Sequence, residues 1–90
     1  MQVDISRSSA NQIKKLTKQL KIEISDTIKT LELIKSANGI SSEKLSNTKD
    51  LYKIRVKNYR IVYRRISNEQ IEIISIRDQQ DIYNKLFGTA

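Results

Sequence analysis

Residues 51–65, LYKIRVKNYRIVYRR, contain six lysine or arginine residues and no acidic residue. The basic side chains alternate with tyrosine, isoleucine and valine, which is the period of a β-strand with one face towards a core. Arginine offers planar, bidentate hydrogen bonds to phosphate, and lysine contributes a compact positive charge. A sheet that fixes such cations on one face is suited to hold a polyanion, and we expect that polyanion to be nucleic acid.

The residue types that the chain lacks narrow the chemistry further. It has no histidine and no cysteine, so histidine-dependent nucleophilic catalysis and zinc sites built from these residues are excluded. The ten acidic residues are scattered along the chain, which argues against a carboxylate-held magnesium site. We therefore predict neither a metal nor another cofactor, and any catalysis must come from lysine, arginine, tyrosine or a single carboxylate.

The way in which this segment folds back on itself decides which face each cation occupies. Lys57–Asn58 fits a two-residue turn in which Asn58 takes a positive φ. This turn pairs Arg55 with Arg60 and gives the strands an apolar and a basic face. The apolar face then consists of Tyr52, Ile54, Val56, Tyr59, Ile61 and Tyr63, and the other face of Lys53, Arg55, Arg60, Val62 and Arg64.

A third strand extends the basic face. The connection Ser67–Gln70 predicts the pairs Ile66–Ile71, Val62–Ser75 and Arg60–Arg77. Like charges opposite each other destabilise a sheet by about 0.2–1 kcal/mol per pair, so an anion is expected to neutralise them. The alternative is that the long basic side chains spread into water over an exposed face. The cations that this register brings together are Lys53, Arg55, Arg60 and Arg77.

The remaining segments supply the elements that support this sheet. The pattern predicts a strand at Gln2–Ile5, a helix that is capped by one of Ser6, Ser8 and Ser9, and a second helix from about Ile22 to Ser36. The helices join at Leu20–Lys21, Gly39 ends the second one, Ile40–Asp50 is a loop and Gln79–Phe87 forms a short helix. The order β-α-α-β-β-β-α describes one α+β domain over residues 1–90, with a helical hairpin packed on a small, mainly antiparallel sheet.

The composition places the protein in the cytoplasm. With 17 basic and ten acidic residues the net charge is +7, which favours phosphate-bearing partners or an acidic protein. No apolar run approaches the about 20 residues of a membrane span, and the N-terminal residues MQVDISRSS lack the apolar centre of a signal peptide. We expect a soluble protein that does not bind a membrane.

The strand region also resembles a family of small proteins. The segments KLSNTKDLYKIRVKNYRIVYRRI and IEIISIRDQQDIY are similar to the RelE/ParE superfamily of toxins from type II toxin–antitoxin systems. The resemblance rests on a Lys-Leu element, a Leu-Tyr-basic strand, a turn, a Tyr-Arg-hydrophobic-Val-Tyr strand and a terminal tyrosine. It implies a cognate antitoxin protein as partner and the strand and helical-hairpin order described above.

For RelE-like members, the resemblance implies an endoribonuclease that cleaves mRNA on the ribosome and inhibits translation. The ribose 2′-OH attacks the adjacent phosphate, and cations stabilise the charge that builds up on the phosphoryl oxygens. Tyr83 or Lys53 would then take the 2′-OH proton, and Arg77 or Arg60 would stabilise the departing 5′ oxygen. The resemblance implies catalytic roles for Lys53, Arg60, Arg77 and Tyr83, and RNA or phosphate contacts for Lys53, Arg55, Lys57, Arg60 and Arg64.

Two other functions stay open. The chain departs from many relatives at Lys57, where they have glycine, and at Asp78-Gln79-Gln80, where they have further basic residues. A ParE-like toxin would inhibit DNA gyrase without cutting RNA, whereas a weakened member would only bind its antitoxin or nucleic acid.

Overall fold

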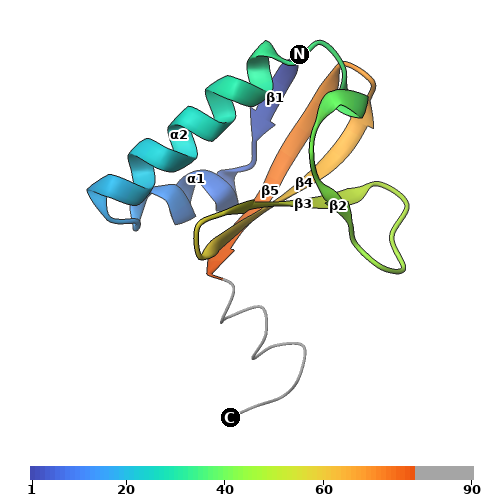
Figure 1. Cartoon of the computed structure of the whole chain (residues 1–90). Coiled ribbons are helices and arrows are strands. Elements are labelled where there is room, and N and C mark those ends of the chain that lie inside the picture. The colour runs from blue at the N-terminus through green and yellow to red at the C-terminus, as the bar shows by residue number, and fades with distance from the viewer. Residues whose placement is uncertain (79–90) are drawn as a thin grey trace.

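The computed structural model describes residues 1–78, which form two helices on a five-stranded sheet (Figure 1). The elements are β1 (Gln2–Ile5), α1 (Arg7–Lys14), α2 (Lys18–Leu33), η1 (Ala37–Gly39), β2 (Glu43–Lys44), β3 (Leu51–Val56), β4 (Tyr59–Ser67) and β5 (Gln70–Asp78). The strand order is β1-β5-β4-β3-β2, with β1 parallel to β5 and every other pair antiparallel. This confirms the predicted α+β class, while the predicted C-terminal helix lies outside the described residues.

The helical hairpin is present, but its junction lies earlier than predicted. The side chain of Ser6 caps α1 by accepting a hydrogen bond from the Ser9 amide, as expected. The hydroxyl of Thr17 caps α2 in the same way, at 3.3 Å from the Leu20 nitrogen. The prediction that the helices join at Leu20–Lys21 is therefore wrong. Apolar residues at a spacing of four continue across Thr17, so periodicity alone did not reveal the cap.

The second helix also ends earlier than predicted, at Leu33 rather than at Ser36, and Gly39 does not end it. Ile34 leaves the helix in an extended conformation, and Gly39 closes the short helix η1 that follows. A side chain at Gly39 would place its Cβ 3.1 Å from the Cγ2 of Ile34. Close packing, and not a left-handed conformation, is therefore what favours glycine here.

The hairpin of β3 and β4 has the predicted register throughout. Tyr52 lies opposite Tyr63, and Arg55 lies opposite Arg60. The rings of Tyr52 and Tyr63 stack with centroids 5.4 Å apart. The turn has the predicted two residues, but Lys57, with a φ of 53°, takes the positive φ that was expected at Asn58.

The pairing of β4 with β5 is partly as predicted. Val62 lies opposite Ser75 and Arg60 opposite Arg77, as expected, but Ile71 lies opposite Arg65 and not opposite Ile66. Two register shifts, one after Val62 and one after Arg65, offset each other. Ser67 lies opposite Gln70, which is the predicted register, so the basic pair was predicted correctly although the pairing is shifted between Val62 and Ser67.

The shift within β5 decides which way its last residues face. Tyr63 lies opposite Ile73, so Ile74 is an extra residue on β5, as in a β-bulge. Ile73 and Ile76 are both buried, although they are three residues apart. Strict alternation from Ile73 would have turned Arg77 towards the core, and the bulge instead turns it to the opposite face.

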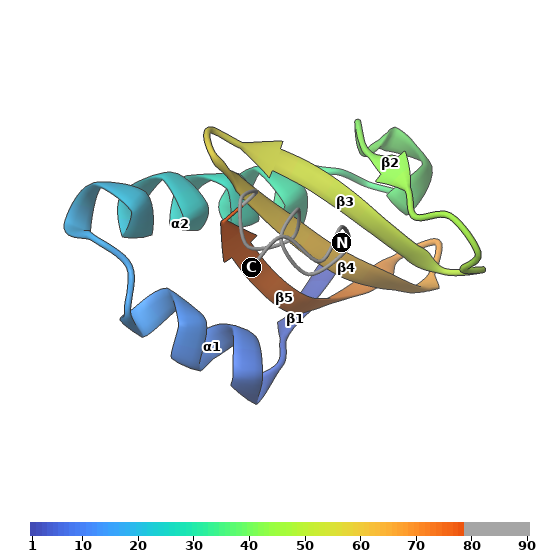
Figure 2. The same cartoon turned by 90° about the horizontal axis from the view of Figure 1, so that it is seen from below.

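The core lies between α2 and the apolar face of the sheet (Figures 1 and 2). Its buried hydrophobic residues are Ile24 and Leu31 from α2, Ala37 from η1, Ile61 and Tyr63 from β4, and Ile71, Ile73 and Ile76 from β5. The predicted apolar face of the hairpin packs against this core. No helix within residues 1–78 is long and apolar enough to cross a membrane.

Helix α1 covers the edge of β5 beyond the end of β1. The Ser9 hydroxyl donates to the Ile73 carbonyl at 3.2 Å, and the Ile76 amide donates to the Gln12 side-chain oxygen at 2.7 Å. These side chains replace the hydrogen bonds that a longer neighbouring strand would make. The half of β5 that carries Arg77 is therefore held in place by α1.

Candidate nucleic-acid interface

The basic face of the sheet is made by four side chains on the side opposite to the core. We define it as Lys53, Arg55, Arg60 and Arg77. Arg60, on the central strand β4, is the Cα partner both of Arg55 on β3 and of Arg77 on β5. The structure thus brings together the four cations that the sequence predicted to converge.

Arg60 lies at the centre of this face and is partly buried. Its Nη1 atom is buried and has no hydrogen-bond partner within residues 1–78. Arg55 donates its Nε to the Lys57 carbonyl at 3.3 Å, and Arg77 donates its Nε to the Ser75 hydroxyl at 3.0 Å. The carboxylates of Glu23, Glu43 and Asp50 form ion pairs with other basic residues. Such an arrangement is suited to contact an anion.

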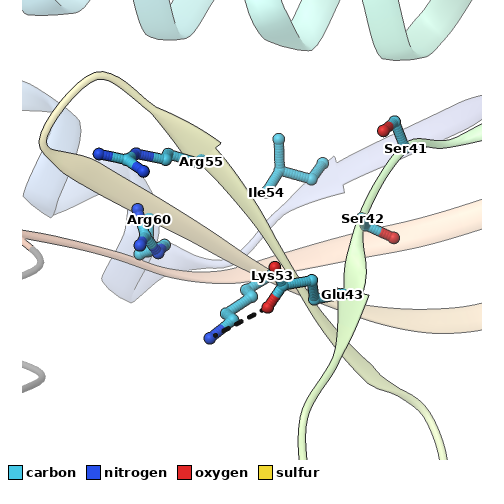
Figure 3. A pocket seen from close by; sticks show the side chains of 7 residues that line it. All are labelled: Ser41, Ser42, Glu43, Lys53, Ile54, Arg55 and Arg60. Atoms are coloured by element: carbon cyan, nitrogen blue, oxygen red, sulfur yellow. Dashed lines mark ion pairs between the residues drawn. The ribbon is translucent and has the colours of Figure 1, made fainter.

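A pocket of about 350 Å³ opens beside the basic face (Figure 3). It lies where the two-residue strand β2 leaves the edge of β3. Arg55 and Arg60 lie on one side of it, and Ser41 and Ser42 lie on the other (Figure 3). The residues that line it are Ser41, Ser42, Glu43, Lys53, Ile54, Arg55 and Arg60.

Glu43 sets the charge balance of this pocket. Its Oε2 lies 3.5 Å from the Nζ of Lys53. The Glu43 side chain is 78% exposed, so the ion pair contributes at most about 1 kcal/mol.

The predicted loop Ile40–Asp50 contains the one part of the site that sequence reasoning missed. Ser41, Ser42 and Glu43 become neighbours of the hairpin only because β2 pairs with β3. A strand of two residues is too short for alternation to reveal it. The opposite charges of Glu43 and Lys53 could have indicated that these residues pair, but only if the pairing of β2 with β3 had been known beforehand.

Two further candidates for phosphate contacts have acidic partners. Lys57 pairs with Glu23 of α2, Nζ to Oε1, at 2.5 Å. This contact holds the pKa of the Glu23 carboxyl below its usual value, mainly through the hydrogen bond from Lys57. Arg64 lies near the other end of β4, with its Nε 3.7 Å from Asp50 Oδ2. Neither residue lines the pocket.

Tyr63 of the hairpin faces the core and not the basic face. Tyr63 lies in the core, and its hydroxyl shares a hydrogen bond with Ser42 at 2.7 Å. Burial raises the pKa of Tyr63 above its usual value, so it stays protonated near neutral pH. The predicted catalytic Tyr83 lies outside the described residues. Asp78 ends β5 opposite Tyr59 and thus follows directly after the basic face.

No group of three or more metal-binding side chains was found among residues 1–78. The described part of the site is therefore a cluster of cations with hydroxyl groups and a carboxylate at its rim. Such a cluster can orient a phosphodiester and stabilise negative charge that develops on it.

The sequence matches the family described as "ParE toxin of type II toxin-antitoxin system, parDE" over residues 3–83. The match spans nearly the whole chain, so the protein belongs to this toxin family and to the RelE/ParE superfamily that the strand motifs indicated. No curated protein matches the chain.

Solved structures share the fold at low sequence identity. The isolated Escherichia coli RelE toxin aligns with a TM-score of 0.69 and 18% identity, over 96% of this chain and 98% of that one. RelE in the intact E. coli RelBE complex aligns with a TM-score of 0.68 and 21% identity, over 86% of this chain and 94% of that one. The RelB–RelE complex from Methanococcus jannaschii aligns with a TM-score of 0.73 and 17% identity, over 90% of this chain and 95% of the matched chain.

Proposed function

We propose that this toxin is a RelE-like endoribonuclease that cleaves mRNA on the ribosome and so inhibits translation. The observation that carries the proposal is the buried Arg60 Nη1 without a partner among the described residues, at the centre of the basic face. A guanidinium in this position gains most from a phosphate, which accepts two parallel hydrogen bonds from it.

The proposed reaction uses the side chains of the basic face. The ribose 2′-OH attacks the neighbouring phosphorus, the bond to the 5′ oxygen breaks, and a cyclic phosphate and a 5′-OH are left. Arg60 and Arg77 stabilise the negative charge on the phosphoryl and departing oxygens. Tyr83 as phenolate, or Lys53 in its neutral form, takes the 2′-OH proton in this scheme, and the departing 5′ oxygen takes a proton from water.

A second function is favoured by a different observation. The family that the sequence matches is described as ParE toxin, whereas the similar folds are RelE toxins. A ParE-like toxin would inhibit DNA gyrase and would not need the four basic positions for catalysis. Supercoiling by purified gyrase in the presence of this protein tests that alternative directly.

An antitoxin is the expected partner for either activity. RelE occurs together with RelB in two of the similar structures. An acidic or amphipathic segment of such a partner would neutralise the basic face and cover the helical hairpin, in line with the charge of +7.

Cleavage of a defined mRNA on translating ribosomes tests the proposed function. We expect wild type to cut the message and Arg60→Ala to lose at least about 100-fold in rate, as is typical when a group that stabilises developing charge is removed. Tyr83→Phe tests the predicted base. Arg7→Ala is the matched control, since Arg7 is an exposed residue of α1 that carries the same charge.

The outcomes separate the three candidate functions. No cleavage by wild type, together with inhibited supercoiling, would replace the nuclease by a gyrase inhibitor. If neither activity occurs and expression of the chain alone does not arrest growth, it only binds its antitoxin or nucleic acid. Equal cleavage by wild type and Arg60→Ala would exclude the basic face as the catalytic site.

A further inference from the structure

The turn between β3 and β4 is tied to the helical layer by an ion pair. The Nζ of Lys57, the first residue of the turn, lies 2.5 Å from Oε1 of Glu23 on α2. The Glu23 side chain is only 20% exposed, and its second carboxylate oxygen is buried. Close packing of this kind leaves the carboxylate few alternative positions. Glu23 therefore fixes the end of the Lys57 side chain, and with it the tip of the hairpin.

The residue that Glu23 holds also contacts a cation of the basic face. The Nε of Arg55 donates a hydrogen bond to the Lys57 carbonyl oxygen at 3.3 Å. Figure 3 shows the Arg55 side chain extending from β3 towards the turn, with Arg60 on the neighbouring strand. Arg55 is exposed, and an exposed arginine otherwise samples several rotamers. This hydrogen bond thus narrows the positions that its guanidinium group occupies next to Arg60.

The backbone of the turn does not account for a lysine at this place. The φ of Lys57 is 53°, in the left-handed region that glycine adopts most readily. Any side chain here therefore weakens the turn. What lysine supplies and glycine lacks is an ammonium group that reaches α2. The contact with Glu23 is therefore the feature of the structure that this lysine serves.

The charge of Glu23 by itself works against a surface that binds RNA. A carboxylate near the basic face lowers the positive potential that attracts a polyanion. If Glu23 acted only through its charge, its removal would strengthen RNA binding. A favourable role of Glu23 in cleavage therefore has to come from geometry, through the two contacts that Lys57 makes.

We propose that Glu23 is a positioning residue of the basic face, which acts through Lys57 to hold Arg55 where it contacts an RNA phosphate. The inference rests on the proposed function, because Arg55 contacts such a phosphate only if the basic face binds RNA. It gives Lys57 a different role from the phosphate contact that the sequence resemblance implies. The Lys57 ammonium group binds Glu23, and its carbonyl oxygen orients Arg55.

Cleavage of mRNA on ribosomes by Glu23→Gln tests this role. Glutamine keeps the size of the side chain but loses the charge that binds Lys57. We expect kcat/KM to fall roughly 10-fold, within the roughly 100-fold that a misplaced group can cost. In an Arg55→Ala background the same substitution should change kcat/KM by less than about 2-fold, because residues that act as one unit are not additive. A loss of about 10-fold in both backgrounds would show that Glu23 acts elsewhere and would overturn the inference.

Two variants at Lys57 separate positioning from folding and from direct contact with RNA. Lys57→Gly suits the positive φ, so we expect the Tm to stay or rise while kcat/KM falls as in Glu23→Gln. The exchanged pair, Glu23→Lys with Lys57→Glu, restores the ion pair and should recover most of the activity. If the exchanged pair cuts less than Glu23→Gln, Lys57 itself contacts phosphate and the inference is wrong. Glu32→Gln is the matched control, since Glu32 is an exposed acid of the same helix, and it should cut like wild type.

NMR relaxation of the arginine side chains makes the test independent of cleavage. In the free toxin, Glu23→Gln should lower the order parameter of the Arg55 Nε–H bond, whereas that of Arg64, which pairs with Asp50, should not change. An unchanged Arg55 order parameter, in a variant that cuts mRNA as well as wild type does, refutes the positioning role alone. A wild type that cuts no mRNA, but in which Arg55 loses order on Glu23→Gln, refutes the nuclease alone.

Discussion

Replacing Arg60 by methionine should make the free protein more stable while it abolishes function. Arg60 keeps Nη1 buried without a partner among the described residues and has Arg77 directly opposite on β5. Methionine fills a similar volume with an unbranched, flexible and uncharged side chain. The substitution therefore removes two unfavourable features and retains most of the packing.

The magnitude follows from these two features. A buried donor without a partner costs about 1–3 kcal/mol, and like charges opposite each other in a sheet cost about 0.2–1 kcal/mol. Because the side chain of Arg60 is only half-buried, we take the lower part of the range and expect a gain of about 1–2 kcal/mol in the free energy of unfolding. For a domain of this size, 1 kcal/mol corresponds to about 4–8 °C in Tm.

Urea unfolding and thermal melting of the isolated toxin measure this gain. Arg64→Met is the matched control, because Arg64 has the same charge but an acidic partner in Asp50 and should change stability by less than about 0.5 kcal/mol. Sulfate should stabilise wild type more than Arg60→Met, since it fills the phosphate position. A variant that is less stable than wild type would refute the reasoning and show that Arg60 is satisfied within the folded chain.

Three further predictions concern the scaffold of the site. Gln12→Ala leaves the Ile76 amide without its acceptor and should cost about 1–3 kcal/mol, with faster hydrogen exchange at Ile76. Ile73→Ala removes a side chain that is 0% exposed and should cost about 2–5 kcal/mol in urea unfolding. Lys57 lowers the pKa of Glu23 in the folded state, so its stabilising effect is present above the usual value of 4.5 and is lost as the pH falls through the folded pKa. Glu23→Gln should therefore weaken the loss of stability that sets in as the pH falls below the usual carboxyl pKa of 4.5.

The first two of these predictions each have a control variant of the same residue type. Gln19→Ala removes only an exposed 3.5 Å contact and should stay within about 0.5 kcal/mol of wild type. Ile66→Ala, at a side chain that is 51% exposed, should cost far less than Ile73→Ala. An unchanged acid profile in Glu23→Gln would mean that the ion pair to Lys57 does not hold the hairpin tip in solution.

The β3–β4 hairpin shows how much of the structure could be predicted from the sequence. Its register followed from a two-residue turn and from alternation, because one wrong step would have turned every tyrosine and isoleucine to the other face. The presence of two helices was predicted correctly, but the position of their junction was not. Leu16 and Leu20 have helical spacing even though Thr17 separates the two helices. Local patterns thus predicted the elements better than their ends.

The basic face was predictable for a narrower reason. Lys53, Arg55 and Arg60 belong to one hairpin, where local pairing sets the geometry. Arg77 joined them only because two register shifts between β4 and β5 offset each other. The pocket wall at Ser41–Glu43 depends on a strand of two residues, which leaves no pattern of its own.

The sequence by itself determined the alternating hairpin, the charge of +7 and the absence of histidine and cysteine, which leaves lysine, arginine, tyrosine or a carboxylate for any catalysis. Only the tertiary structure decided that Ile74 forms a bulge that turns Arg77 towards Arg60. It also decided that Lys57 is held by Glu23 and that Glu43 reaches Lys53. The physical reason is that alternation and charge are local properties, whereas these contacts require segments far apart in the chain to pack against one another.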